Sequence, residues 1–140
     1  MSPIAAAHAV ATLFMCGLIW FVQVVHYRLF DGVGEDGFPA YEERHTRRTG
    51  WVVGPPMLVE IAAAAWLLLN EDPAFRAPFA AIGFGLLAVI WALTGLVAVP
   101  AHGQLARGFD RDVHRRLMAM NLARTVLWTA RGALVVTAWL

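Results

Sequence analysis

Residues 51–69 read WVVGPPMLVEIAAAAWLLL, and this stretch decides the fold. Glu60 is the one charged residue of this stretch. The length of the stretch is close to the roughly 20 residues that a helix needs to cross the bilayer core. Three more predominantly apolar stretches occupy residues 4–27, 78–104 and 117–140. The sequence therefore predicts an all-α, integral membrane four-helix bundle that forms one domain over residues 1–140.

The composition favours the same class of protein. Hydrophobic residues make up 59% of the chain and charged residues 15%, whereas a soluble domain is about 25% charged. The net charge of +1 and the lack of a basic stripe argue against nucleic acid as a partner. The single cysteine, Cys16, excludes an internal disulfide. We expect the lipid bilayer as a partner, and a homo-oligomer or a larger membrane complex both stay open.

The arginines predict the orientation. The loops after the first and third stretches, with their flanks, carry Arg28, Arg44, Arg47, Arg48, Arg107, Arg111, Arg115 and Arg116. The loop between the second and third stretches carries only Arg76. Because cytoplasmic loops of membrane proteins are rich in Lys and Arg, we expect a multi-pass protein of the cell inner membrane with both termini outside, in the periplasm.

The second membrane helix is expected to begin well before residue 51. Pro39 suits a first helical position after the break at Asp36 and Gly37. A helix that starts there forms a cytoplasmic extension of the second span. Pro55 and Pro56 should bend this helix, because each proline lacks an amide donor and its ring clashes with the preceding turn.

Two ionisable residues are predicted deep in the spans. Ionisable groups inside a membrane are costly and usually face the bundle interior. Glu60 lies about 13 Å past Trp51 and Arg124 about 10 Å past Leu117, at 1.5 Å per residue. We therefore predict that Glu60 and Arg124 pair, and whether the pair is catalytic or structural stays open.

The last span carries a polar stripe. Asn121, Arg124, Trp128 and Arg131 recur at helical spacing and so share a face that should point inward. With Glu60, Arg124 and Asn121 are the candidate catalytic residues. Arg131, nearer the outer end, is expected to extend outward toward residues 71–72.

Four of the five histidines fall at the predicted cytoplasmic level: His26, His45, His102 and His114. His8 lies near the outer end and is interpreted as a residue of the membrane–water interface. His114 is also interpreted mainly as an interfacial residue and less as a ligand. Helix bundles build metal and cofactor sites from side chains on facing helices. The candidate metal ligands are His26, His45, Glu60 and His102, and a haem would be held by His26, His102 and Arg124. Glu42-x-x-His45 also places a carboxylate and an imidazole on one helical face.

The favoured function is a haem- or metal-dependent redox or oxygenase-like protein. Imidazoles suit iron or copper, and Arg124 would bind a carboxylate such as a haem propionate. The substrate would be a hydrophobic small molecule at the cytoplasmic membrane face. One alternative is a non-enzymatic accessory or structural subunit of a larger membrane complex. A proton relay or small transporter is a weaker one, because no inverted repeat is evident.

Trp20-Phe21, Arg28-Leu29-Phe30, Glu43-Arg44 before the proline-broken span, and the stretch 116–121 carry a family resemblance. Their layout resembles that of the HemJ-type protoporphyrinogen oxidases, small haem-binding membrane proteins. This resemblance implies a four-helix membrane fold and haem as the cofactor. Residues 53–60 and 102–124 are also similar to uncharacterised small four-helix membrane proteins of bacteria. This second similarity indicates no activity.

Overall fold

A computed structural model describes residues 2–70 and 77–138, and these residues form helices without any strand. The first helical rod consists of α1 (Pro3–Phe21), a π-helical segment η1 (Val22–His26) and a 3-10 segment η2 (Tyr27–Gly32). The second consists of η3 (Glu35–Gly37) and α2 (Phe38–Leu69). The third consists of α3 (Ala77–Leu93), a π-helical η4 (Thr94–Ala98) and α4 (Val99–Leu105), and the fourth is α5 (Arg111–Thr137). The predicted all-α, four-helix arrangement is confirmed.

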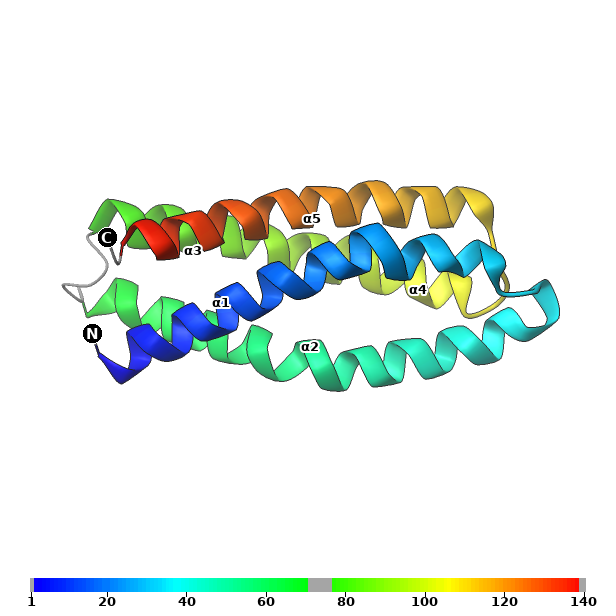
Figure 1. Ribbon diagram of the computed structural model, residues 1–140, viewed down its shortest axis with the longest axis horizontal. Helices are drawn as coiled ribbons and strands as arrows, with labels where there is room; N and C mark the ends of the chain where they lie inside the picture. The colour runs from blue at the N-terminus through cyan, green and yellow to red at the C-terminus, as the bar shows by residue number, and fades with distance from the viewer. Residues whose placement is uncertain (1, 71–76, 139–140) are drawn as a thin grey trace.

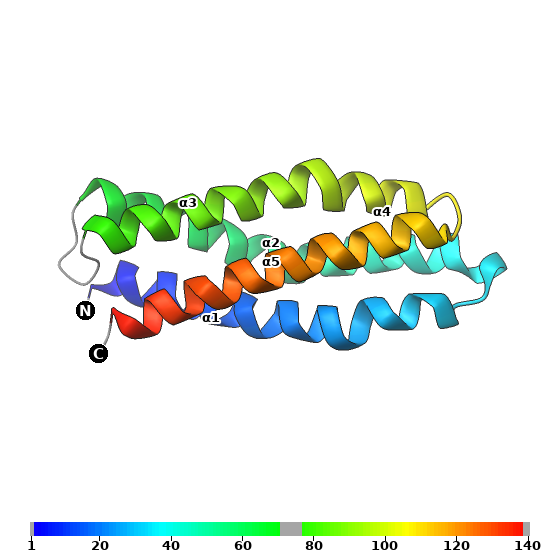
Figure 2. The same cartoon turned by 90° about the horizontal axis from the view of Figure 1, so that it is seen from above.

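The four rods run alternately up and down in one bundle. Helix α1 begins at the same end of the bundle at which α5 ends (Figures 1 and 2). α1 packs against α2 and α5, and α3 packs against α2 and α5. The tight connection from α4 to α5 passes through Gly108, whose φ of 151° is one that residues with a side chain rarely adopt. Asp110 then caps α5 by accepting hydrogen bonds from the amides of Asp112 and Val113.

Helix α2 is longer than a membrane span. Its 32 residues correspond to about 48 Å at 1.5 Å per residue, against roughly 30 Å for the hydrocarbon core. The predicted helical extension ahead of residue 51 is therefore present, while the side of the membrane on which it lies stays a prediction. Pro55 and Pro56 lie inside the helix, which continues through them, and its ribbon changes direction along its length (Figure 1).

Three of the rods are long and apolar enough to cross a membrane: Pro3–Gly32, Glu35–Leu69 and Pro78–Leu105. The fourth rod, α5, does not meet that criterion within the described residues. Its apolar part contains Asn121, Arg124 and Arg131, which lower its mean hydropathy. Arg124 and Arg131 are nevertheless buried. The predicted crossing by residues 117–140 therefore remains a prediction.

The bundle exposes large apolar side chains and buries several ionisable ones within an otherwise apolar core. Leu96, Trp51 and Leu69 are 78–80% exposed, and many other large apolar side chains share this outer surface. The described interior holds ionisable side chains, among them Glu42, Glu60 and Arg131. A water-soluble protein rarely exposes so much apolar surface, and membrane proteins turn their ionisable residues toward the bundle interior. This distribution suits a lipid environment.

Both π-helical segments lie just before residues of the candidate site. η1 ends at His26 and is followed by Tyr27, and η4 is followed by α4, which carries His102. In the third rod the irregularity has a local cause, because Pro100 cannot donate to the carbonyl four residues earlier and its ring clashes with that carbonyl. π-helical turns are rare and often mark functional sites.

Candidate metal centre

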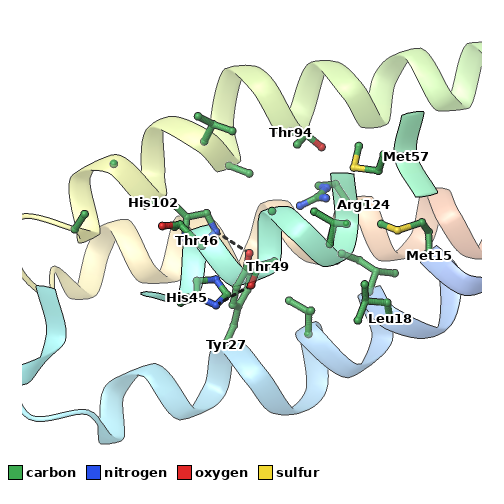
Figure 3. A pocket seen from close by; sticks show the side chains of 18 residues that line it. Met15, Leu18, Tyr27, His45, Thr46, Thr49, Met57, Thr94, His102 and Arg124 are labelled. Carbon is green, nitrogen blue, oxygen red and sulfur yellow. Dashed lines mark hydrogen bonds between the residues drawn. The ribbon is translucent and has the colours of Figure 1, made fainter. Parts of the chain in front are cut away.

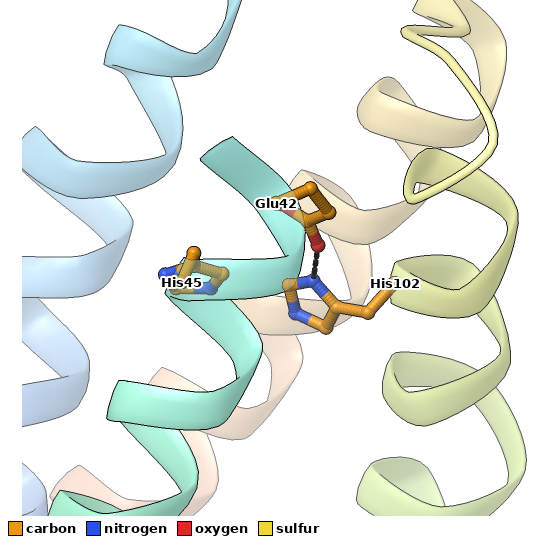
Figure 4. A group of neighbouring side chains, drawn as sticks. All are labelled: Glu42, His45 and His102. Atoms are coloured by element: carbon orange, nitrogen blue, oxygen red, sulfur yellow. Dashed lines mark hydrogen bonds and ion pairs between the residues drawn. The ribbon is translucent and has the colours of Figure 1, made fainter. Parts of the chain in front are cut away.

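Glu42, His45 and His102 form a group that could hold a metal ion. Each offers one ligand atom, and these atoms all lie within 4.8 Å of one another (Figure 4). Glu42 and His45 are three residues apart on α2 and therefore share a helical face, and His102 reaches them from α4. Glu42 and His45 are buried, and His102 is half-buried.

Glu42 and His102 are already in direct contact. Their Oε1 and Nδ1 atoms are 2.5 Å apart, in a hydrogen bond that is also an ion pair when the imidazole is protonated. The second carboxylate oxygen of Glu42, Oε2, is buried and has no hydrogen-bond partner among the described residues. A buried carboxylate oxygen left without a partner costs free energy, and a cation bound by the group would satisfy it.

Three neighbouring side chains hold the two imidazoles in place. Nε2 of His26 lies 2.8 Å from Nδ1 of His45, and the Thr49 hydroxyl lies 3.1 Å from the same nitrogen. The Tyr27 hydroxyl lies 2.8 Å from Nε2 of His102. Histidine ligands of metals commonly engage their second ring nitrogen in a hydrogen bond of this kind, which fixes the ring and its tautomer.

A layer of aromatic rings surrounds the group on the side away from the termini. The Phe30 ring packs edge-on against His45 and His26, with ring centroids 5.2 and 5.4 Å apart, and stacks on His114 at 5.8 Å. Nε2 of His114 also forms a 2.7 Å hydrogen bond with the backbone oxygen of Tyr27. His114 therefore supports the segment that carries Tyr27, and it is buried in the protein rather than interfacial.

The structure places the four predicted metal ligands in two regions. His45 and His102 lie together in the group, and His26 contacts His45 from outside it. Glu60 belongs to a different network farther along α2, where its oxygens accept hydrogen bonds from the Thr12 hydroxyl and from Nε1 of Trp128, at 2.8 and 3.2 Å.

The predicted pairing of Glu60 with Arg124 is wrong, because Glu60 pairs with Arg131. Nη2 of Arg131 lies 3.0 Å from Oε1 of Glu60, and Nε donates to the same oxygen at 3.1 Å. The depth estimate failed because it was counted from residues 51 and 117. Both helices begin earlier, at Phe38 and Arg111, so those two starting points need not lie at one level.

The predicted outward extension of Arg131 is also wrong. The side chain is 1% exposed, and its Nη1 donates a hydrogen bond to the Gly83 backbone oxygen. Its Nη2 lies 3.1 Å from Nε2 of His8, which is buried rather than interfacial. Arg131 is thus buried together with the opposite charge of Glu60. Residues 71–72, toward which Arg131 was expected to extend, lie outside the described residues.

A cavity of about 360 Å³ adjoins the metal group (Figure 3). His45 and His102 line it together with Tyr27, while Glu42 does not. The walls are largely apolar and include Met15, Leu18, Ile19, Val22, Val53 and Met57. This volume lies in the range of pockets that bury small ligands. The two imidazoles thus connect the buried group to a space that an apolar molecule can occupy.

The two remaining candidates on α5 have different surroundings. Arg124 lines the cavity and has its guanidinium carbon 5.1 Å from the centre of the Trp128 ring. Asn121 does not line the cavity, and its Nδ2 donates a 2.8 Å hydrogen bond to Oε1 of Gln23. Arg124 is therefore placed to meet a ligand, whereas Asn121 joins α5 to the first rod.

Sequence reasoning missed Glu42 and Tyr27 as members of the site. The signal for Glu42 was the Glu42-x-x-His45 spacing, but the ligand role went to Glu60 because that residue lies deeper in an apolar stretch. Tyr27 gave no comparable signal, since its position depends on the π-helical and 3-10 segments on either side of His26.

The chain was also compared with known proteins. No protein family matches it, and neither a curated protein nor a solved structure does. The resemblance to the HemJ-type family therefore stays a prediction, and the candidate site is interpreted from its own geometry.

Proposed function

We propose that this protein is a membrane-embedded, metal-dependent redox or oxygenase-like enzyme. Glu42, His45 and His102 would hold a transition metal ion, and a hydrophobic small molecule would bind in the adjoining cavity. The observation that carries the proposal is the convergence of two imidazoles and a carboxylate from two helices, within 4.8 Å, at the edge of an apolar cavity.

The donor set favours iron. Two histidines and one carboxylate with open positions are typical of non-haem iron(II) oxygenases, and imidazole also suits copper and zinc. Such an iron ion would supply redox chemistry with dioxygen as the oxidant. An ion is favoured over haem because His26, one of the two proposed haem ligands, does not line the cavity and is bonded to His45.

The protein's own residues would prepare the site. His26 and Tyr27 hold the rings of His45 and His102 through their hydrogen bonds. The apolar walls would exclude water from a bound substrate, and dry surroundings strengthen electrostatic interactions inside a site. With Arg-rich loops on the cytoplasmic side, the centre would lie near the cytoplasmic face of the inner membrane, with both termini in the periplasm.

Metal binding by the wild-type protein tests the proposal. Detergent-purified protein treated with a chelator is expected to bind one Co²⁺ or Fe²⁺ per chain, and Co²⁺ should give visible absorption bands of a site with nitrogen and oxygen ligands. Elemental analysis and a spectroscopic titration measure the stoichiometry. A folded protein that binds no ion would contradict the proposal and would favour the accessory-subunit alternative.

Replacing Tyr27 by phenylalanine tests the supporting hydrogen bond. The variant Tyr27→Phe keeps the ring that packs on Phe30 but loses the hydroxyl at 2.8 Å from His102. We expect the metal affinity to fall by about 10–100-fold, as for other outer partners of metal ligands. Competition with a chelator of known affinity measures it, and an unchanged affinity would show that Tyr27 does not support the ligand.

A further inference from the structure

The cavity contains one buried charge for which the described residues provide no counter-charge. Arg124 is 6% exposed and lines the cavity. Its Nε atom is buried and has no hydrogen-bond partner among the described residues. In the view of Figure 3, the side chain lies between His102 on one side and Met15 and Met57 on the other.

The two buried glutamates of the described residues already have partners. Glu60 pairs with Arg131 and also accepts from Trp128, and Glu42 is bonded to His102. None of the described Asp and Glu residues lines the cavity. The Trp128 ring, 5.1 Å from the guanidinium carbon, offers a cation–π contact, but a ring face accepts none of the strong, directed hydrogen bonds for which a guanidinium has five donors. A buried ion without a partner is strongly destabilising.

We propose that the cavity binds an amphipathic monocarboxylate, such as a medium-chain fatty acid, whose carboxylate pairs with Arg124. A guanidinium matches a carboxylate with two parallel hydrogen bonds, and a single buried arginine balances a single negative charge. The apolar chain would pack against the methionine and aliphatic walls, where flexible Met15 and Met57 adapt to its shape. This deepens the proposed function, because it names the chemical class of the substrate.

The cavity is lined by exposed residues on one side of the bundle. Among its lining residues, Gly50 on α2 and Val99 and Gly103 on α4 are exposed. A Cβ added at Gly50 or Gly103 would meet nothing within 4 Å. The opening therefore lies between α2 and α4, at the border of the apolar outer surface that begins at Trp51, where a fatty acid with its carboxylate at the membrane surface would arrive.

Binding of decanoate to the chelator-treated protein tests this inference without any metal. Native mass spectrometry from detergent micelles is expected to show one decanoate per chain. Decanoate should bind about 10-fold or more tightly than decanol, which has the same chain without the charge, as for a hydrogen bond to a charged group. Equal affinities, or no binding of decanoate, would overturn the inference. Binding of decyl phosphate without decanoate would also overturn it and would assign the cavity to a lipid phosphate.

Variants of the arginine complete the test. Arg124→Gln should remove the preference for decanoate over decanol, and Arg124→Lys should keep part of it. The exposed Arg116 on the same helix provides the matched control, Arg116→Gln, which should bind as the wild type does. An unchanged preference in Arg124→Gln would overturn the inference, and if that variant fails to fold, the wild-type comparison and Arg124→Lys still decide it. Decanoate binding by a protein that takes up no metal would refute the proposed metal site alone.

Discussion

Replacing Arg131 by methionine is expected to lower the free energy of unfolding by about 3–5 kcal/mol, because it leaves the buried Glu60 carboxylate without its counter-charge. Both side chains are at most 1% exposed, and they are joined by a 3.0 Å ion pair. The same substitution frees the Gly83 carbonyl and removes the contact with His8. Unfolding in mixed micelles of increasing sodium dodecyl sulfate content, followed by circular dichroism, measures the loss.

A second substitution separates the charge from the packing. In the double variant Glu60→Gln with Arg131→Met, no unpaired carboxylate remains, so much of the lost stability should return. Arg116→Met, at an exposed position of the same helix, is the control and should change the stability by no more than about 0.5 kcal/mol. If the single Arg131 variant were as stable as this control, the pair would not hold the bundle together.

Removing a ligand of the metal group should have the largest effect on metal binding. The variants Glu42→Gln and His102→Gln are expected to lower the affinity for Co²⁺ at least ~100-fold, because the loss of a ligand should exceed the 10–100-fold loss caused by an outer partner. At a metal concentration of about 100 times the wild-type Kd, the ion stabilises the folded protein by roughly 2.7 kcal/mol. This stabilisation should be absent in both variants, as a thermal unfolding scan with and without metal would show.

Glu43→Gln is the matched control for these variants. Glu43 is the next residue of the same helix, but it is exposed rather than buried, so the same chemical change there should leave metal binding intact. If Glu43→Gln and Glu42→Gln lowered the affinity equally, the effect would come from the overall charge and not from coordination.

The fold could be predicted from the sequence because long apolar stretches separated by polar turns form helices of bilayer-spanning length. Four apolar stretches of spanning length indicated four helices, and Pro39 after a glycine indicated the extension of α2. The histidines of the site followed from the same argument, since the up-and-down topology brings residues 45 and 102 to one end of the bundle. To place these histidines together, it was enough to know that each is an imidazole and at which end of its helix it lies.

The partners of the charged residues could not be predicted in the same way. Depth along a helix was counted from the apparent edges of the apolar stretches. An error of about two turns is enough to exchange Arg124 for Arg131 as the partner of Glu60, because these arginines are seven residues apart. Rotation of each helix about its own axis adds a second unknown, which the sequence pattern leaves open. Glu60 was favoured over Glu42 as the carboxylate of the metal group for a different reason, because it lies deeper in an apolar stretch.

The two π-helical turns, η1 and η4, make the site depend on the number of residues in the chain. A π-turn accommodates one residue more than an α-turn, so everything beyond it is rotated by about 100°, the angle that one residue subtends in an α-helix. Deleting a single residue from either segment would let it relax to regular α-helix. Tyr27 or His102 would then swing away from its partners, although the rod would keep nearly its full length. Inserting one residue into a regular transmembrane helix can therefore create such a centre, and deleting that residue can abolish it. Neither change alters the side chains that compose the centre.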